Sequence, residues 1–206
     1  MTLRLQDKTI LITGAARRVG AETARVLHAE GASLALHYRR SAEAAKALVA
    51  ELNAARPGSA LAFQADLLDI EHLPRLVADV VEHFGRLDAL VNNASSFYAT
   101  LVGNIGERDW EDLIGTNLAG LSGLTRALAL ELGPHVRVNA VAPGPILWPE
   151  DGSFDAAAQA HVVSRTLLKR CGDPADIART VLCLIADAPF ITGQIVAVDG
   201  GRSVML

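Results

Sequence analysis

The stretch KTILITGAARRVG, residues 8–20, decides the fold. Its apolar run at 8–13 is typical of a short buried strand, and the apolar residues of 18–31 recur at helical spacing. Gly14 and Gly20 permit a tight turn and close approach of the backbone to a ligand. Because the free N–H groups and the dipole of the following helix favour negative charge, this order predicts a loop that binds a dinucleotide pyrophosphate. The alternative is an ordinary strand–helix turn.

The same alternation of strand and helix continues along the chain. Strands are predicted at 33–38, 60–65, 87–93 and 194–201, a strand with its turn at 135–144, and helices at 41–55 and 69–85, with two more helices before the last strand. Continuous apolar strands that alternate with amphipathic helices indicate an α/β fold, a doubly wound parallel sheet in three layers of the Rossmann type. Since no linker or internal repeat interrupts the pattern, we predict a single domain over residues 1–206.

Composition excludes several classes of function. Half of the 206 residues are hydrophobic, and the net charge of −4 with a pI near 5.8 gives no sign of nucleic-acid binding. No apolar run reaches the length of a membrane span, and the N-terminus passes straight into a strand with no room for a signal peptide. Cys171 and Cys183 are expected to be reduced structural thiols, and the scattered histidines predict no metal site. We therefore expect a cytoplasmic protein.

The end of the second strand predicts which dinucleotide binds. NAD-selective folds place an acidic residue there for the ribose 2′-hydroxyl, but this strand ends HYRRS, residues 37–41. Arg39 and Arg40, with Arg17 from the glycine loop, can grip a 2′-phosphate through paired hydrogen bonds, and Ser41 adds a hydroxyl at a helix start. The sequence therefore predicts NADPH, with a solvated basic patch as the alternative. The residues expected around the adenosine half are Gly14, Arg17, Gly20, His37, Tyr38, Arg39, Arg40, Ser41, Asp66 and Leu67, where Asp66 would accept from the adenine amino group.

Motifs along nearly the whole chain resemble the short-chain dehydrogenase/reductase family. They are TGAARRVG (13–20), QADL (64–67), VNNAS (91–95), Asn117, RVNAVAPG (137–144) and ITGQIVAVDGG (191–201). Within the family, LHYRRS, NNASSFY and PGPILWPE resemble bacterial pteridine reductases, which reduce dihydropterins and folates with NADPH. The resemblance implies that hydride passes from the nicotinamide to a C=N bond of the pterin.

The resemblance also implies further site residues. Asn93, Ala94, Ser95, Pro143, Gly144 and Ile146 would line the cofactor, the last three beside the nicotinamide. Ser95 would also contact the pterin, Phe97 would stack on its face, and Trp148 would form part of the substrate wall. Asn117 would hold a water of the proton relay, as the one catalytic residue present. Core packing is the alternative for Phe97, and a plain surface position for Trp148.

The family's proton donor has no counterpart in this sequence. That donor is a tyrosine with a lysine four residues later, but four residues after Tyr38 and Tyr98 stand Ala42 and Val102. The stretch 112–133, DLIGTNLAGLSGLTRALALELG, resembles the end of one helix joined to the end of another. The family's fifth strand and several dozen residues would therefore be absent near Leu118–Gly120, and the glycines there predict a helix break at 118–123.

Three explanations stay open. The gene product carries a deletion, the sequence omits residues that the molecule has, or Ser95, Tyr98 or His161 donates the proton. We expect an impaired NADPH-dependent pterin or folate reductase, or alternatively a non-catalytic NADP-binding or interaction protein of the same fold. Reduction of another carbonyl substrate is a third possibility. A homo-oligomer is expected, weakened because the altered segment would lie in its interface.

Overall fold

The structure, a computed structural model, describes residues 3–94, 121–148 and 154–204. These residues form two compact units. The first comprises 3–94 with 177–187, and the second comprises 121–148, 154–176 and 188–204. Each unit contains its own parallel sheet.

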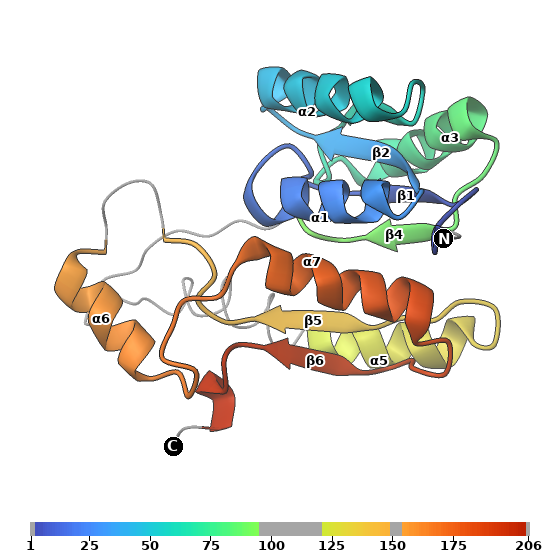
Figure 1. Ribbon diagram of the computed structural model, residues 1–206. Helices are drawn as coiled ribbons and strands as arrows, with labels where there is room; N and C mark the ends of the chain where they lie inside the picture. Colours follow the sequence, from blue (N-terminus) through green and yellow to red (C-terminus); the bar gives the residue numbers. More distant parts are fainter. Residues whose placement is uncertain (1–2, 95–120, 149–153, 205–206) are drawn as a thin grey trace. The chain divides into compact units, whose positions relative to one another are not determined.

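The first unit is built on a four-stranded parallel sheet. Its strands are β1 (Thr9–Ile12), β2 (Ser33–Tyr38), β3 (Ala60–Gln64) and β4 (Ala89–Val91), in the order β3-β2-β1-β4 (Figure 1). Ile10 of β1 lies opposite Leu34 of β2 on one edge and Ala89 of β4 on the other. Because every pairing is parallel, the carboxyl ends of the strands, and the turns that follow them, gather at one edge of the sheet.

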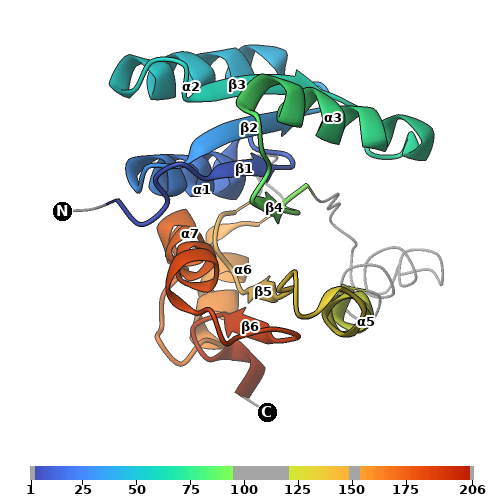
Figure 2. The same ribbon diagram turned by 90° about the vertical axis from the view of Figure 1, so that its right-hand side faces the viewer.

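Helices cover both faces of this sheet (Figure 2). They are α1 (Arg18–Ala29), α2 (Ala42–Ala55) and α3 (Leu73–Phe84), which follows a 3₁₀ turn at Ile70–His72. Side chains alternate along a strand, so Ile12 and Leu36 pack with Leu27 of α1 and Leu48 of α2, whereas Leu11 and Ala35 face Leu76 and Val80 of α3. The three-layer α/β architecture predicted from the sequence is confirmed.

Helices α1 and α2 begin at or next to the predicted residues, whereas α3 begins at Leu73, four residues after the predicted start at 69, because 70–72 form a 3₁₀ turn. Ser41 is the N-cap of α2 as predicted, although its side chain makes no capping hydrogen bond. Gly31, two residues beyond α1, has φ +102°, a backbone conformation that favours glycine. Pro74 lies in the first turn of α3, directly after the 3₁₀ turn. Proline is tolerated there because the first N–H groups of a helix have no intrahelical partner.

The second unit contains a two-stranded sheet. β5 (Ala140–Pro143) pairs in parallel with β6 (Ile195–Val198), and α5 (Leu121–Leu132) contacts β5. The remaining elements here are α6 (Ala156–Ser164) and a 3₁₀ turn at Arg202–Val204. α7 (Pro174–Leu182) starts in this unit, while its residues from 177 onward, with the π-turn Cys183–Asp187, belong to the first.

Three predicted strands are shorter than expected, and the one predicted at 194–201 covers only Ile195–Val198. The strand predicted at 87–93 covers only 89–91, because the backbone and side chain of Asn93 bond to Thr13 instead of continuing a ladder. The strand predicted at 135–144 begins at Ala140. Before it, the Arg137 guanidinium donates to the carbonyls of Ala188 and Ile191, so this segment is bonded to a turn and not to a strand.

The predicted loss of one strand agrees with the division into two sheets. No strand pairing within the described residues joins β4 to β5. The predicted helix break at 118–123 falls largely in 95–120, outside the described residues, and the single-domain organisation stays a prediction. None of the helices that the structure describes is both long and apolar enough to cross a bilayer.

Candidate functional site

A network of hydrogen bonds joins the carboxyl ends of β1 and β4. The Thr13 hydroxyl oxygen accepts the backbone N–H groups of Asn93 at 2.9 Å and Ala94 at 3.0 Å. In return, Asn93 Nδ2 donates to the carbonyl oxygens of Thr13 at 3.0 Å and Gly14 at 3.1 Å. Sequence reasoning placed Asn93 and Ala94 at the site but assigned no role to Thr13. The signal available for it was a hydroxyl residue between a buried strand and the first loop glycine.

The two glycines of the loop leave no room for a side chain. Gly14 has φ +61°, and a Cβ there would lie 2.9 Å from the Cα of Ala94. A Cβ on Gly20 would lie 2.5 Å from both the Gly14 carbonyl oxygen and Asn93 Nδ2. Contacts this short force something to shift, so the turn from β1 into α1 requires glycine at both positions, as the sequence predicted.

His37 lies beneath the glycine loop. Its side chain is 2% exposed, and its Nδ1 lies 3.2 Å from the Gly14 N while its Nε2 lies 3.1 Å from the Ala65 carbonyl oxygen. The carbonyl of His37 accepts the next loop amide, that of Ala15, at 3.0 Å. Burial lowers the pKa of His37, against the opposing influence of the Ala65 carbonyl and Asp66. The His37 side chain bonds to the backbone of the glycine loop, and its predicted contact with the cofactor stays a prediction.

Two loop amides are thus directed at β2, and the amides that follow lead into the first turn of α1. The first N–H groups of a helix have no intrahelical partner and attract anions. Arg17 occupies the N-cap position of α1 and is exposed. The arrangement therefore fits a phosphate group at this turn, on the later amides and not on those of Gly14 and Ala15.

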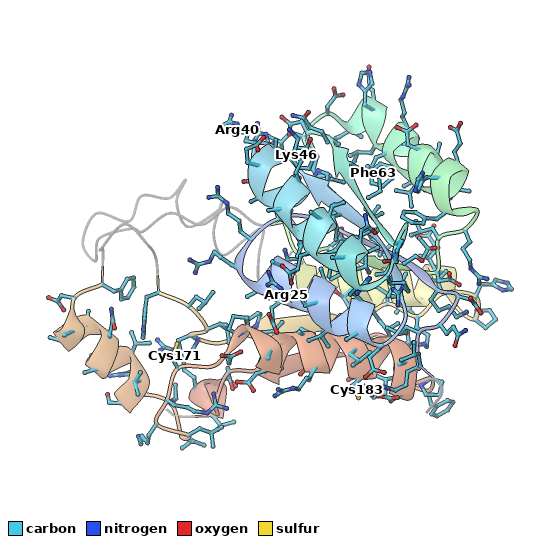
Figure 3. All side chains as sticks on the ribbon, turned by 45° about the horizontal axis from the view of Figure 1, so that its top comes forward. Arg25, Arg40, Lys46, Phe63, Cys171 and Cys183 are labelled. Carbon is cyan, nitrogen blue, oxygen red and sulfur yellow. The ribbon has the colours of Figure 1, made fainter. Side chains whose placement is uncertain are left out.

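Basic residues lie at the neighbouring strand ends. Arg39 Nη2 pairs with Asp66 Oδ2 at 2.8 Å, which joins the end of β2 to the end of β3, and Gln64 Nε2 donates to the Arg39 carbonyl. Arg40 is exposed and projects from the end of the unit at which α2 begins (Figure 3). Asp66 was predicted to accept from adenine, and here its carboxylate binds Arg39. Three more residues predicted around the adenosine half lie at the same strand ends and are partly buried: Tyr38, Ser41 and Leu67.

The segment predicted to border the nicotinamide belongs to the second unit. A Cβ on Gly144 would lie 2.5 Å from the Cα of Asp199, so glycine lets the end of β5 approach the turn after β6. Ile146 is buried, and the Cys171 thiol lies 3.0 and 3.1 Å from the carbonyl oxygens of Pro145 and Ile146. Burial raises the pKa of Cys171, so the thiol stays protonated and can donate to one of them. This agrees with the predicted structural thiol.

The remaining predicted residues are only partly described. Pro143 ends β5 and is exposed, and the Trp148 ring lies 5.6 Å from that of Phe154, centroid to centroid, at 33° between the planes. Ser95, Phe97 and Asn117 lie outside the described residues, as do the alternative donors Ser95 and Tyr98. His161, the third alternative, lies on α6 and is exposed.

Comparison with known protein families assigns both halves of the chain. The short chain dehydrogenase family matches residues 8–122, and a second family, described as enoyl-(acyl carrier protein) reductase, matches residues 113–203. A 3-oxoacyl-(acyl-carrier-protein) reductase of Staphylococcus aureus is 32% identical over 240 aligned residues, covering 94% of this chain and 97% of the relative. Pteridine reductase 1 of Leishmania tarentolae is 31% identical over 286, covering 98% and 99%.

A solved structure shares the architecture. A blue fluorescent protein from a metagenomic library, crystallised in complex with NADPH, superposes with a TM-score of 0.85 at 29% identity, over 97% of this chain and 99% of that one. The likeness therefore extends over both units.

The lengths of the alignments show how many positions of a relative this chain lacks. Coverage of 94% of 206 residues is about 194 residues, so about 46 of the 240 positions aligned with the Staphylococcus aureus reductase have no residue in this chain. This agrees with the several dozen residues predicted to be absent, and the two family matches overlap at 113–122, around the predicted junction. With the fold, the loop and both matches in agreement, this chain belongs to the short chain dehydrogenase family of oxidoreductases.

Proposed function

We propose that this chain binds NADPH through the first unit and derives from a reductase of dihydropterins or folates. The observation that carries the proposal is the glycine turn between β1 and α1. Gly14 and Gly20 are packed too closely for any side chain, so the backbone can approach a ligand there, and the first turn of α1 offers N–H groups to a pyrophosphate. The nicotinamide, when bound, supplies a hydride. The chain's own residues bind the cofactor, orient it and shield it.

The charges at the strand ends support NADPH over NADH. The sequence has no acidic residue at the end of β2, and the carboxylate of Asp66, which follows β3, is paired with Arg39 at 2.8 Å. This pairing holds the Arg39 guanidinium in place. It also offsets the negative charge of Asp66, which would otherwise repel a 2′-phosphate. Arg40 and Arg17 are exposed, and no ion pair is recorded for either within the described residues. Both are therefore available to a phosphate.

An aromatic pair in the second unit supports the proposal that the substrate is planar. Trp148 and Phe154 form an aromatic pair, and flat aromatic faces suit a planar heterocycle. We propose that this pair forms part of the pterin wall, together with Ser95 and Phe97, and that Asn117 holds the relay water. Pro143, Gly144 and Ile146 would border the nicotinamide, their loop held by the Cys171 thiol. A 3-oxoacyl thioester, the substrate class in the name of the Staphylococcus aureus relative, is the competing substrate.

The missing donor pair favours a second candidate function. Because the sequence contains no Tyr-x-x-x-Lys, no phenol with a lysine partner can deliver the proton that completes a reduction. A chain of this length would then bind NADPH and turn over little or no substrate, as a non-catalytic nucleotide-binding or interaction protein. We propose further that residues 1–206 act as one domain in a weakened homo-oligomer in the cytoplasm.

The test uses the purified chain, after intact mass has shown that the polypeptide is the 21.7 kDa species. NADPH and NADH binding are followed by cofactor fluorescence, and NADPH consumption by absorbance with dihydrobiopterin or a 3-oxoacyl thioester. We expect tighter binding of NADPH than NADH and negligible turnover of either substrate. Turnover at an enzymatic rate would refute the impaired-enzyme proposal, and absence of NADPH binding would refute the cofactor proposal.

Two variants examine the phosphate contacts. Arg40→Asp should weaken NADPH by about tenfold or more and leave NADH nearly unchanged, since a charge-assisted contact to the 2′-phosphate contributes roughly 1.5–3 kcal/mol. Arg75→Asp is the matched control, because Arg75 lies on α3 with a side chain that is 80% exposed. Equal loss of NADPH and NADH in the Arg40 variant would show that Arg40 does not read the 2′-phosphate.

A further inference from the structure

His37 is the buried side chain that connects the glycine loop to two strands. Its ring lies between the Gly14 amide, 3.2 Å from Nδ1, and the Ala65 carbonyl, 3.1 Å from Nε2. Its own carbonyl takes the Ala15 amide at 3.0 Å. One residue of β2 thus holds two consecutive amides of the loop and also contacts the segment that follows β3.

These partners fix the protonation state of the ring. A backbone N–H can only donate and a carbonyl can only accept, so Nδ1 must carry a lone pair and Nε2 must carry the hydrogen. Both nitrogens are satisfied only in the neutral tautomer with hydrogen on Nε2. Burial lowers the pKa of the ring, which favours the same neutral form.

We propose that neutral His37 is a positioning residue for the cofactor loop, which holds Gly14 and Ala15 against β2 so that the amides leading into α1 face the pyrophosphate, and that protonation of its ring releases this hold. The proposal rests on the NADPH binding proposed above and names the residue that sets the shape of that site. A protonated ring has N–H on both nitrogens, so Nδ1–H would oppose the N–H of Gly14, and the loop would have to move.

The surroundings leave the loop little freedom to adapt. Gly14 is already so close to Ala94 that an added Cβ would lie 2.9 Å from its Cα, so a shift of the glycine toward that residue is blocked. The charged residues on the neighbouring segments are Asp66 after β3, Arg39 after β2, Arg17 at the N-cap of α1 and Arg18 at its first position. Asp66 favours the protonated ring, but its carboxylate is shared with Arg39.

The direction of the pH effect follows from the lowered pKa. A histidine whose folded pKa lies below its ordinary value of 6.5 keeps the native loop fully stable above that value. The stabilisation is lost as the pH falls below 6.5 toward the folded pKa. NADPH binding should weaken once the ring of the folded chain is itself protonated, near and below the lowered folded pKa, while the rest of the fold persists.

Two isosteric variants separate the two ring contacts. In His37→Asn the amide oxygen can take the place of Nδ1 and accept from Gly14, whereas in His37→Gln the amide nitrogen can take the place of Nε2 and donate to Ala65. Neither titrates. Between pH 7.5 and pH 5.5, wild-type affinity for NADPH should fall more than that of His37→Asn, by a factor of up to about ten, because the folded pKa lies below 6.5. At pH 7.5, His37→Gln should bind about tenfold more weakly than His37→Asn. The 2′-phosphate itself titrates at about pH 6. The comparison with His37→Asn removes the contribution of the phosphate to the pH dependence of binding.

A second measurement stands apart from cofactor binding. In the ¹⁵N-labelled full chain without cofactor, the His37 ring should show the tautomer with hydrogen on Nε2, and the Gly14 amide resonance should shift with the same midpoint as that ring. If NADPH does not bind at any pH, the proposed function fails, and the Gly14 resonance alone decides the role of His37. Hydrogen on Nδ1, a Gly14 resonance that ignores the ring, or equal NADPH affinity in His37→Gln and His37→Asn would overturn the proposal. Melting temperatures of both variants show whether the variants are folded. If either variant is unfolded, the Gly14 resonance of the wild-type chain decides the role of His37.

Discussion

The strands of the two units differ in how completely they are covered. All four residues of β1 are buried, and so are the four central residues of β2. None of the four residues of β5 or of β6 is buried, although both strands have equally apolar sequences. An apolar strand therefore becomes a core strand only when other strands and helices are present to cover it.

The difference follows from what each sheet contains. A parallel strand is stable when helices cover both faces and neighbours occupy both edges. In the first unit, β1 has β2 and β4 at its edges and helices on either side, whereas the described residues of the second unit form two strands. About 46 positions of a relative have no counterpart here, and the predicted junction at 118–120 precedes α5 of the second unit. The glycine loop lies in the first unit, which fits the proposal that this chain binds NADPH and turns over little substrate.

Restoring the lost segment should have the largest effect on this comparison. A chimera that receives the segment of the Staphylococcus aureus reductase between Leu118 and Gly120 should gain turnover of about 10²–10⁴-fold, the usual contribution of a positioned general acid. The measurement is NADPH oxidation with dihydrobiopterin and with a 3-oxoacyl thioester. A second chimera with the inserted tyrosine changed to phenylalanine is the control. A folded chimera as inactive as the parent would show that more than the donor pair is missing.

The second prediction concerns the glycine packing that the first unit depends on. Gly20→Ala should abolish measurable NADPH binding and destabilise the chain by about 3 kcal/mol or more, because its Cβ would lie 2.5 Å from a carbonyl oxygen and from Asn93 Nδ2. Chemical denaturation and fluorescence titration measure the two effects.

Gly123→Ala in α5 provides the opposite case. Nothing lies within 4 Å of a Cβ there, so alanine should stabilise this helix by about 0.5–1 kcal/mol. If Gly20→Ala bound NADPH as well as Gly123→Ala does, the close packing of the loop would not be what shapes the site.

The sequence was sufficient for most of the fold and for part of the site. Apolar runs and helical spacing predicted the elements of residues 8–85, because local pattern and burial agree where both faces of a sheet are covered. The same pattern overextended the strand at 135–144. There the side chains of Arg137 and Asn139 and the backbone of Val138 bond to the turn at 188–193, a partner about fifty residues away that no local pattern reveals.

Contacts between distant segments account for what the sequence did not predict at the site. HYRRS predicted a phosphate-binding strand end, but not that His37 turns inward to Gly14, 23 residues away, or that Asp66 pairs with Arg39. The two loop glycines were predictable because their requirement is local. The roles of Ser95, Phe97 and Asn117 stay predictions, since they lie outside the described residues.

The third prediction compares one substitution in the two sheets. Ile12 of β1 is 0% exposed, so Ile12→Ala should destabilise the chain by about 4 kcal/mol through lost burial and the cavity left behind. Ile195 of β6 is only partly buried, and Ile195→Ala should destabilise it by roughly half as much. Urea denaturation of both variants checks the difference. Equal losses would mean that the second sheet is as well covered as the first.

The smallest expected effect concerns the amino end of the first sheet. Asp88 accepts the backbone N–H of Thr9 at 2.9 Å, Arg86 Nη2 at 2.6 Å and Lys8 Nζ at 3.2 Å. Burial alone would raise the pKa of Asp88, but the hydrogen bonds from Arg86 and Thr9, with Lys8, outweigh it and lower the pKa to about 2. Because the folded pKa lies below the ordinary 3.8, this carboxylate stabilises the fold above pH 3.8 and ceases to do so as the pH falls toward 2.

Asp88→Asn should therefore destabilise the chain by about 2 kcal/mol at pH 7, with the gap between variant and wild type closing as the pH falls from 4 to 2. Asp79→Asn is the control, since Asp79 lies on the surface of α3, 3.9 Å from Arg75, and should change stability by less than about 0.5 kcal/mol. Denaturant midpoints at several pH values give both differences. A gap for Asp88→Asn that stays constant down to pH 2 would show that the charge of this carboxylate does not hold β1 to the segment before β4, and that apolar burial alone makes the first unit the more stable one.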